Sequence, residues 1–267
     1  MKSKNNIAIG CIIQARMSST RLPGKVMLKV DNENTILDCV INQLQNSKEI
    51  KNIVIATTDQ KEDDVIAEFV KNRAIKYFRG SKKDVLDRYY QCAKKFNFSE
   101  IIRITSDNPL IDYEIVDTVV EHFKSNNYDF ITTDQPLNIF HRTYPFGYGV
   151  EVFTFSALEN AWKNAKLPSE REHVTPYFYK NKEIFRQTSI ENSEDHSRFR
   201  CTVDTKYDLE LIQKIYSNIK KRPILLSDVI KLLKANPELV KINAHVKADG
   251  YLRSLKEDMK IKPTKKK

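Results

Sequence analysis

Short runs of aliphatic and β-branched residues alternate along the chain with longer segments in which apolar residues recur every three or four positions. The short runs predict strands, and the recurring spacing predicts helices with one buried face. Strands are expected at residues 7–14, 52–56, 75–78, 101–105 and 129–132. Helices are expected near residues 36–44, 65–70, 86–96 and 115–123, and then at 156–165, 170–180, 207–218 and 226–235.

This alternation predicts an α/β fold with a mainly parallel central sheet flanked by helices, because parallel strands need crossover connections. The pattern changes after Thr133, where "QPLNIFHRTYPFGYGVEVF" is rich in turn residues and aromatics. We interpret residues 134–155, approximately, as an insertion that carries a β-ribbon arm, and "FRCTV" (199–203) as a further strand. One domain over residues 1–247 followed by a basic tail at 248–267 is the simplest organisation.

The composition suits a packed core, since 40% of the 267 residues are hydrophobic. No apolar stretch approaches the roughly 20 residues that span a bilayer, and the chain starts without a signal-peptide pattern, so we expect a cytoplasmic protein with no membrane span. The four cysteines form no CxxC pair and are expected to be buried or free thiols. The net charge of +10 includes a lysine-rich end, which predicts a solvated terminus rather than a nucleic-acid partner.

The segment "QARMSSTRLPGK" (14–25) follows the first strand and concentrates Arg16, Arg21 and Lys25 beside Gly24. Ligands of a parallel sheet collect at the carboxyl ends of its strands, and clustered cations there favour phosphate. The loop contains neither a GxxxxGK[ST] phosphate loop nor a GxGxxG dinucleotide pattern. It therefore predicts polyphosphate binding through side chains as much as backbone. A solvated basic turn is the alternative that the loop alone leaves open.

Two aspartates follow predicted strands on the side of the sheet where this loop lies. Asp107 stands in "IIRITSDNPLID", and Asp204 stands in "FRCTVDTKYDLE". Either one alone would suit a turn or a helix cap. Together with the cationic loop they favour a shared Mg²⁺ site, because Mg²⁺ is held by one or two carboxylates and by phosphate oxygens. The sequence thus predicts a site for a nucleotide–metal complex with Mg²⁺ as the cofactor.

The loop "QARMSSTRLPGK" closely resembles the N-terminal signature of the CMP-sugar-acid synthetases, the cytidylyltransferases that activate 3-deoxy-manno-octulosonate and sialic acids. The match is closest to their spore-coat-polysaccharide-type relatives. Further matching segments follow in the family's order over residues 53–212, and the resemblance covers about residues 7–235. These segments are "IVIATTD", "FRGSKKDVLDRYYQCAK", "RITSDNPLID", "GYGVEVF", "EREHVTPYFY" and "TVDTKYDLELI".

The resemblance implies a nucleotidyltransferase with a glycosyltransferase-A-like fold that uses CTP and Mg²⁺. It implies backbone contacts from Ala15 to the nucleotide, phosphate contacts from the three loop cations, and metal ligation by the two aspartates. Asp84 and Arg88 fall where the family recognises cytidine, although Asp84 would also suit an N-cap and Arg88 its partner four residues on.

Two departures limit what the resemblance implies about the acceptor. Synthetases for octulosonate or sialate carry a glutamine, or a Gln-Gly-Asp pattern, where this chain reads Thr105-Ser106-Asp107. After "FRGS" the chain reads Asp-Val-Leu-Asp-Arg in place of Ser-Gly-Thr-Asp-Arg. Nucleotide handling therefore transfers from the family, whereas the acceptor stays open as a sugar acid, a sugar phosphate or a related acidic molecule.

In the expected reaction an acceptor oxygen attacks the α-phosphorus of CTP in line and pyrophosphate leaves. Mg²⁺ on Asp107 and Asp204 is expected to polarise the α-phosphate, while Arg16 and Lys25 neutralise the leaving group. On this basis Arg16, Lys25 and Asp107 are the expected catalytic residues. A hydroxyl nucleophile would need a general base, and a phosphate nucleophile would need none.

The acceptor-binding candidates lie in the insertion and in "EREHV". Glu151, Arg171 and His173, with Glu172 beside them, are predicted to bind the acceptor, since Arg171 suits an anion and His173 suits a base. Surface charges on a helix and a structural histidine are the alternative. The aromatics of the inserted arm predict a subunit interface, and hence a homodimer.

Three other functions stay open at this point. The first is a nucleotidyltransferase that uses another NTP or a non-sugar phosphorylated acceptor. The second is a nucleotide-sugar-dependent glycosyltransferase, a class that usually has a DxD motif where this chain has Ser106-Asp107-Asn108. The third is a nucleic-acid-binding domain, whose cations would spread over one face. Cations concentrated at one strand end favour an enzyme that binds a triphosphate.

Overall fold

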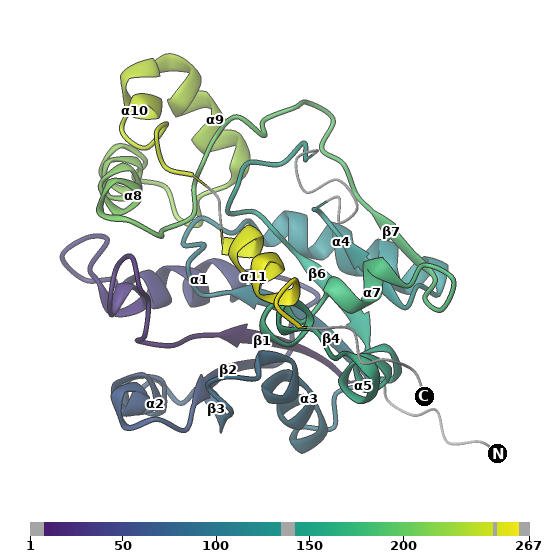
Figure 1. The fold of residues 1–267 in the computed structure, drawn as a ribbon. Coiled ribbons are helices and arrows are strands. Elements are labelled where there is room, and N and C mark those ends of the chain that lie inside the picture. Colours follow the sequence, from purple (N-terminus) through teal and green to yellow (C-terminus); the bar gives the residue numbers. More distant parts are fainter. Residues whose placement is uncertain (1–7, 135–141, 248–249, 262–267) are drawn as a thin grey trace.

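A computed structural model describes residues 8–134, 142–247 and 250–261. Within these ranges seven strands form one sheet in the order β3-β2-β1-β4-β6-β5-β7 (Figure 1). The strands are β1 (Ile9–Gln14), β2 (Ile53–Thr58), β3 (Lys76–Gly80), β4 (Glu100–Thr105), β5 (Phe130–Thr132), β6 (Glu151–Thr154) and β7 (Gln187–Ser189). Neighbours among β1 to β4 are parallel, as are β5 and β7, whereas β6 runs antiparallel to β4 and β5. The predicted α/β fold with a mainly parallel sheet is confirmed.

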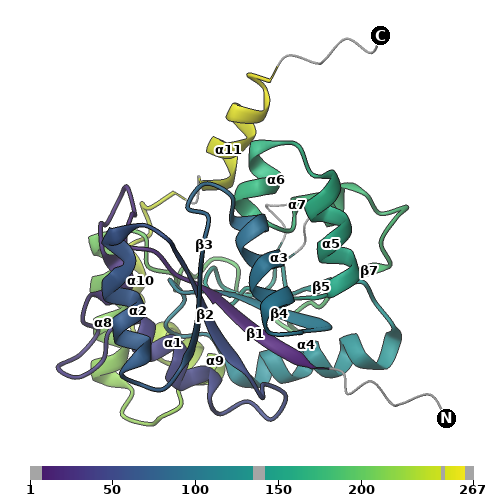
Figure 2. The ribbon, with the colours of Figure 1, turned by 90° about the horizontal axis from the view of Figure 1, so that it is seen from below.

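Helices cover both faces of this sheet (Figure 2). Successive residues of β1 point to opposite faces of the sheet, and both faces are apolar. Ile13 packs in one apolar cluster with α1, α2 and α4, and Ile12 packs in another with α3, α5 and α7. These helices are α1 (Ile36–Leu44), α2 (Asp64–Lys71), α4 (Tyr113–Asn126), α3 (Val85–Lys95), α5 (Phe155–Asn164) and α7 (Pro176–Lys180). Two short 3₁₀ turns, η1 (Lys25–Met27) and η2 (Lys61–Asp63), precede α1 and α2. Every helix in the described ranges is too short or too polar to cross a membrane.

A third apolar cluster joins the second half of the chain to the sheet. It is built by α8 (Lys206–Asn218) and α9 (Leu226–Ala235), with α10 (Pro237–Lys241) at its edge. Buried residues of α8 and α9 meet Ile36 of α1 and Tyr148 there. This packing holds the start of α8, where Asp204 lies, against the first half of the chain.

The segment predicted as an inserted ribbon arm is different in the structure. Its last part is β6, which lies inside the central sheet between β4 and β5, and Val152 and Phe153 are fully buried on opposite faces. Tyr144 and Tyr148 are also buried in the core of this chain, so they are not available for the subunit interface that we expected. Apolar residues that alternate between two covered faces are the pattern of an inner strand. Residues 135–141 lie outside the described ranges.

Two other elements differ from the prediction. The expected strand at 199–203 is an extended segment with one isolated bridge, between Arg200 and Phe146, because no neighbouring strand lies along it in the described chain. The expected helix at 170–180 is divided into α6 (Pro168–His173) and α7. Pro176 starts the second helix, and Val174 between them has a φ of 72°, so the chain turns there.

The predicted solvated tail contains a helix, α11 (Gly250–Asp258), that packs against α6. Its last residue holds it in place, because Asp258 accepts hydrogen bonds from the backbone nitrogen of Ser169 at 2.8 Å and from the Ser169 hydroxyl at 2.5 Å. The tail residues 262–267 lie outside the described ranges. All four cysteines are free and buried, as the sequence predicts.

Candidate functional site

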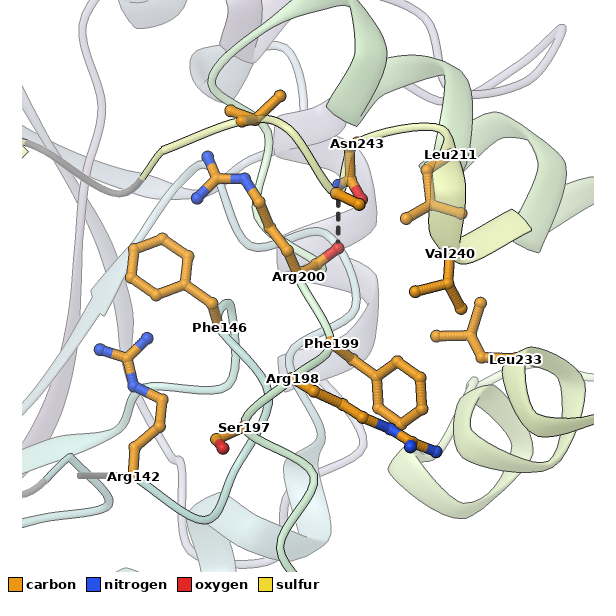
Figure 3. A pocket seen from close by; sticks show the side chains of 12 residues that line it. Arg142, Phe146, Ser197, Arg198, Phe199, Arg200, Leu211, Leu233, Val240 and Asn243 are labelled. Atoms are coloured by element: carbon orange, nitrogen blue, oxygen red, sulfur yellow. Dashed lines mark hydrogen bonds between the residues drawn. The ribbon is translucent and has the colours of Figure 1, made fainter. Parts of the chain in front are cut away.

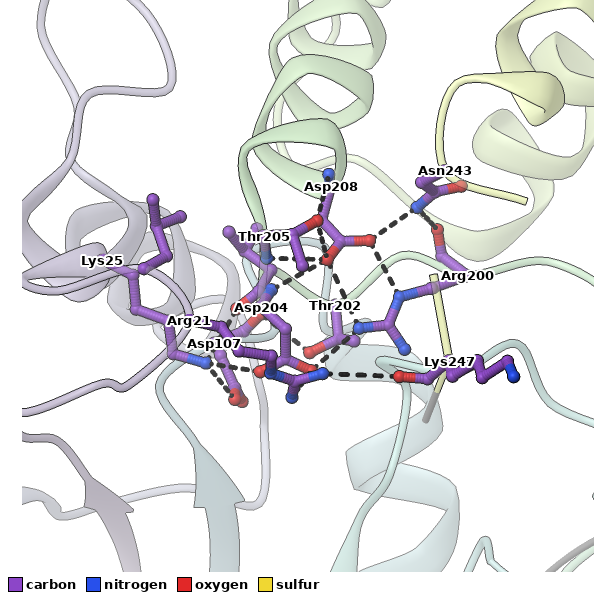
Figure 4. A network of polar contacts seen from close by, with 12 residues as sticks. Arg21, Lys25, Asp107, Arg200, Thr202, Asp204, Thr205, Asp208, Asn243 and Lys247 are labelled. Atoms are coloured by element: carbon purple, nitrogen blue, oxygen red, sulfur yellow. Dashed lines mark hydrogen bonds and ion pairs between the residues drawn. The ribbon is translucent and has the colours of Figure 1, made fainter. Parts of the chain in front are cut away.

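The side chain of Lys25 joins the two aspartates predicted as metal ligands (Figure 4). Its Nζ donates to Asp107 Oδ2 at 2.8 Å, to Asp204 Oδ1 at 2.9 Å and to the carbonyl oxygen of Val203 at 2.8 Å. All three ammonium protons are therefore used, and only 12% of the Lys25 side chain is exposed. The structure thus brings the cationic loop and both aspartates to one place.

Backbone contacts explain how the two aspartate turns meet. The nitrogen of Val203 donates to the carbonyl oxygen of Asp107 at 2.8 Å, so the extended segment 199–203 lies against the turn that follows β4. Gly147 allows the segment to come close, since its φ is 114° and an added Cβ would stand 2.7 Å from the backbone of Cys201. A glycine is required at this position for both reasons.

The buried carboxylate of Asp63 holds the opening loop in place. Asp63 is fully buried, accepts the backbone nitrogen of Met17 at 2.6 Å, and is hydrogen-bonded by the Thr58 hydroxyl. Gly24, with a φ of 70°, closes the loop through its nitrogen on the Met17 carbonyl at 2.8 Å. Ala15, predicted to contact the nucleotide, is buried at the mouth of β1, and its nitrogen is used by the Ala56 carbonyl at 3.1 Å. Of its backbone groups, only the carbonyl is left for a ligand.

Asp208 is the buried anchor of the turn that carries Asp204. It accepts the backbone nitrogens of Asp204 and Thr205 at 3.0 and 2.9 Å, and the Asn243 amide at 2.9 Å. Arg200 donates to Asp208 Oδ1 and Asp204 Oδ2, both at 2.8 Å. Our sequence analysis missed Arg200 and Asp208. The capping-box spacing from Thr205 to Asp208 was the available signal, whereas nothing marked Arg200.

The network around Lys25 is balanced in charge. Arg21 completes it, with Nη2 2.9 Å from Asp204 Oδ2 and Nη1 3.4 Å from the Lys247 carbonyl oxygen. Its three cations and three carboxylates are Arg21, Lys25, Arg200, Asp107, Asp204 and Asp208. Such neutrality makes the burial of these charges tolerable, since an unpaired buried charge is costly.

The pKa values follow from this arrangement. Burial would raise the pKa of Asp204, but the charges of Lys25, Arg21 and Arg200 outweigh it and hold that pKa below its ordinary value. Burial would lower the pKa of Lys25, but the carboxylates of Asp107 and Asp204 raise it above its ordinary value. Lys25 and Asp204 are therefore both charged over the physiological pH range.

Arg16 and Arg88 are cations of another kind. In the part of the chain that the structure describes, Arg16 makes no hydrogen bond or ion pair, and Arg88 has no carboxylate partner. Arg88 is only 1% exposed; its Nη1 donates to the Ser81 carbonyl at 2.7 Å, and its buried Nε has no partner. Burial and the charge of Arg16 lower the pKa of Arg88. A buried donor without an acceptor is rare and marks a place that a ligand oxygen can fill.

Asp84 has both a structural contact and a link to the acceptor candidates. Its Oδ1 caps α3 by accepting the nitrogen of Asp87 at 2.9 Å, as expected for an N-cap. Its Oδ2 pairs with Arg171, whose Nε lies 2.9 Å away, and not with Arg88. Arg171 also donates to the Trp162 carbonyl at 2.8 Å. The guanidinium of Arg171 is thus already engaged inside the chain.

The other two acceptor candidates are engaged as well. Glu151 pairs with Arg103 of β4 and accepts the Thr175 hydroxyl at 2.6 Å. His173 lies beneath α11 with Nε2 2.9 Å from the Ser254 hydroxyl, and burial lowers its pKa to about 4 despite the neighbouring Glu172. The three candidates make no contact with the Lys25 network among the described residues. Arg103 was missed, although a charged residue inside the apolar run "IIRIT" was a signal.

The remaining question is which residues could hold a metal ion. In the described ranges no group of three or more His, Cys, Asp or Glu side chains is placed to hold one. Asp107 and Asp204 offer hard oxygen donors of the kind that Mg²⁺ prefers, with water and phosphate oxygens as its other ligands. In this structure Asp107 Oδ2 and Asp204 Oδ1 accept the Lys25 ammonium, so an ion bound to these two oxygens would replace Lys25 there.

Comparisons with known proteins show what this chain is similar to. A family model described as Cytidylyltransferase matches residues 10–237. The spore coat polysaccharide biosynthesis protein SpsF of Bacillus subtilis is 34% identical over 236 residues, which cover 85% of this chain and 94% of that protein. A cytidylyltransferase structure from Leptospira borgpetersenii has a TM-score of 0.81 at 38% identity, covering 87% of this chain and 96% of that chain. A CMP:2-keto-3-deoxy-manno-octonic acid synthetase complexed with CTP shares the fold, with a TM-score of 0.58 at 17% identity over 79% of this chain and 98% of that chain.

The Asp208 anchor predicts a specific acid response. Burial would raise the pKa of Asp208, but Arg200 and Asn243 hold it below its ordinary value, so its contribution to stability is present above about pH 4 and is lost as pH falls further. Asp208→Asn should lower the free energy of unfolding by roughly 3 kcal/mol near pH 7, because it leaves Arg200 partly unpaired. Urea unfolding followed by circular dichroism from pH 7 to pH 2 should show this difference shrinking below pH 4.

Asp59→Asn is the matched control, since Asp59 is exposed and accepts a side-chain hydrogen bond only from the adjacent Gln60. It should change the unfolding free energy by less than about 0.5 kcal/mol at any pH. A difference between wild type and Asp208→Asn that stays constant down to pH 2 would contradict the assigned charge state.

Proposed function

The chain belongs to the cytidylyltransferase family, as its motifs predict, and from this membership we propose that it transfers CMP from CTP to a small acidic acceptor with release of pyrophosphate. The acceptor class is a sugar acid, a sugar phosphate or a related acid. The name of SpsF supports a place in surface polysaccharide biosynthesis, and we expect the enzyme to act in the cytoplasm. The observation that carries the proposal is the meeting of Lys25 with Asp107 and Asp204 beside the cationic loop.

The nucleotide is proposed to bind over the opening loop. Arg16 would contact the phosphates most strongly, because it makes no hydrogen bond or ion pair among the described residues. Arg21 and Lys25 are predicted to contact the phosphates as well, and Lys25 to neutralise the departing pyrophosphate, in exchange for contacts that they now make with Asp204 and Asp107. The Ala15 carbonyl stays a predicted contact of the nucleotide, and Asp84 and Arg88 stay predicted contacts of the cytidine.

We propose Mg²⁺ as the cofactor, held by Asp107 and Asp204. Their two oxygens fit a hard ion that takes its other ligands from water and from phosphate. When bound, the ion would supply positive charge that polarises the α-phosphate. Asp204 is ionised across the physiological range, because Lys25, Arg21 and Arg200 hold its pKa below the ordinary value, and a bound ion would take the place of part of this positive charge.

The reaction requires the protein mainly to position the acceptor and CTP. An acceptor oxygen forms a bond to the α-phosphorus of CTP, the bond from that phosphorus to the bridging oxygen breaks, and pyrophosphate leaves with the electron pair. Among the acceptor candidates, Glu151 and Arg171 are held in ion pairs, and His173 donates Nε2–H to Ser254 because the single Ser254 proton goes to Glu172. These contacts favour positioning roles and an acceptor whose oxygen is already anionic, such as a phosphate.

Pyrophosphate release is the direct test of the proposal. The purified protein with Mg²⁺, each of the four NTPs, and a panel of sugar acids and sugar phosphates should release pyrophosphate with CTP and with one class of acceptor. Asp107→Asn should reduce the rate by about 10²–10³, the usual cost of losing one preorganised charged group at a reaction centre.

Glu121→Gln, which changes an exposed carboxylate on α4, should keep the wild-type rate in the same assay. Equal rates with all four NTPs would refute the cytidylyl assignment. A near-wild-type rate for Asp107→Asn at saturating Mg²⁺ would refute its metal role.

We also propose that the protein is a homodimer. Since Tyr144 and Tyr148 are buried within the chain, the support now comes from the family resemblance and from Leu252, Met259 and Ile261, which are exposed on α11 and just beyond it. Light scattering at micromolar protein should give twice the chain mass of 31.2 kDa. A mass of one chain across that concentration range would refute the dimer.

A further inference from the structure

A pocket is lined in part by Arg200, which also belongs to the Lys25 network (Figure 3). It has a volume of about 210 Å³ and is bounded by the segments around Phe146 and Phe199 and by α8, α9 and the residues after α10. Ligand pockets usually measure about 300–1,000 Å³, so this one suits one end of a small molecule rather than a whole nucleotide.

Three arginines line this pocket, and none of the described residues that line it is acidic. Arg142 and Arg200 are partly compensated, since Arg142 lies 3.2 Å from Asp134 and Arg200 pairs with Asp204 and Asp208. Arg198 makes no ion pair or hydrogen bond within the described ranges and stacks on Phe199 at 4.7 Å. The pocket therefore carries an excess positive charge that is presented by planar guanidinium groups, which suit carboxylate and phosphate oxygens.

One wall of the pocket is largely apolar. Leu211 of α8, Leu233 of α9 and Val240 of α10 lie together on the side of the pocket that also holds Phe199 and the Arg198 side chain, whereas Arg142 lies on the other side (Figure 3). A free inorganic anion would gain nothing from such a wall. A molecule with an anionic end and a carbon skeleton would use both sides of the pocket.

The position of Arg200 ties this pocket to the reaction centre. Its guanidinium contacts Asp204 at 2.8 Å, and Asp204 is bridged by Lys25 to Asp107. A molecule anchored in the pocket would therefore extend along Arg200 toward the proposed metal ligands. Arg171, a candidate taken from the sequence, is less available than Arg198, because Asp84 already binds its guanidinium.

We propose that the Arg142–Arg198–Arg200 pocket binds the acidic group of the acceptor and so sets which acceptors are used. The inference rests on the proposed function, because it assigns the acceptor half of that reaction. The ligand is an oxyanion on a small sugar, and it has two sources, the carboxylate of a sugar acid or the phosphate of a sugar phosphate.

Calorimetric titration of the full chain with 3-deoxy-manno-octulosonate and, separately, with glucose 1-phosphate tests the site and distinguishes the two sources. Wild type should bind at least one of them. Arg198→Ala should weaken that binding about tenfold or more, since a hydrogen bond to a charged group contributes roughly 1.5–3 kcal/mol. Arg198→Lys should recover part of the loss, because it restores the charge without the planar fork. The affinity for CTP should stay within about twofold.

Arg186→Ala is the matched control, because Arg186 is also exposed and stacks on an aromatic ring, Tyr128, at 5.4 Å, away from the pocket. It should leave sugar binding unchanged. Ala244→Trp is a second variant that fills the pocket from an exposed lining position without removing a charge, and it should also abolish sugar binding.

The results separate this inference from the proposed function. Binding of neither sugar to wild type, or equal binding to wild type, Arg198→Ala and Ala244→Trp, would overturn the acceptor pocket. Equal losses in Arg186→Ala and Arg198→Ala would overturn it too, because they indicate a general effect of charge. Sugar binding that depends on Arg198, in a protein that releases no pyrophosphate from any NTP, would support the pocket and refute the proposed reaction.

Discussion

The ammonium of Lys25 between Asp107 and Asp204 is the interaction on which the candidate site depends. These residues come from the opening loop, the turn after β4 and the start of α8, and each is held by its own structural support. Asp63 fixes the loop, the Asp107 carbonyl accepts the nitrogen of Val203, and Asp208 fixes the last turn. Because Lys25 is mostly buried, its charge depends on compensation by the two carboxylates.

This balance divides the cations of the site into two groups. Arg21, Lys25 and Arg200 neutralise carboxylates, so they add little net charge to the region. Arg16 and Arg88 have no such partners in the described chain, and one donor of Arg88 is unsatisfied. A polyphosphate would therefore meet uncompensated positive charge at Arg16, next to the Asp107–Lys25–Asp204 network. We base the proposed nucleotide site on this arrangement.

Local patterns in the sequence were sufficient for much of the fold. Apolar spacing placed α1, α3, α8 and α9 within a few residues, since each buries one face, and the motifs placed both aspartates beside Lys25. Contacts between distant segments were not predictable in this way. The alternation of apolar and polar residues at 151–154 suits both a ribbon arm and an inner strand, so we predicted the wrong place for β6. The segment at 199–203 is extended as predicted, but no neighbouring strand in the described chain pairs along it. The pairing of Arg171 with Asp84 and the docking of α11 depend on tertiary geometry that no local spacing encodes.

A double-mutant cycle between Lys25 and Asp204 tests this account most directly, because it measures whether the two side chains interact in the folded chain. Unfolding free energies of wild type, Lys25→Met, Asp204→Asn and the double variant should give a coupling of about 1 kcal/mol or more. The control cycle combines Lys29→Met with Asp204→Asn. It should give a coupling near zero, because the Lys29 ammonium hydrogen-bonds to the Glu33 carbonyl oxygen and not to Asp204. A coupling near zero for Lys25 and Asp204 would contradict the convergence that organises the site.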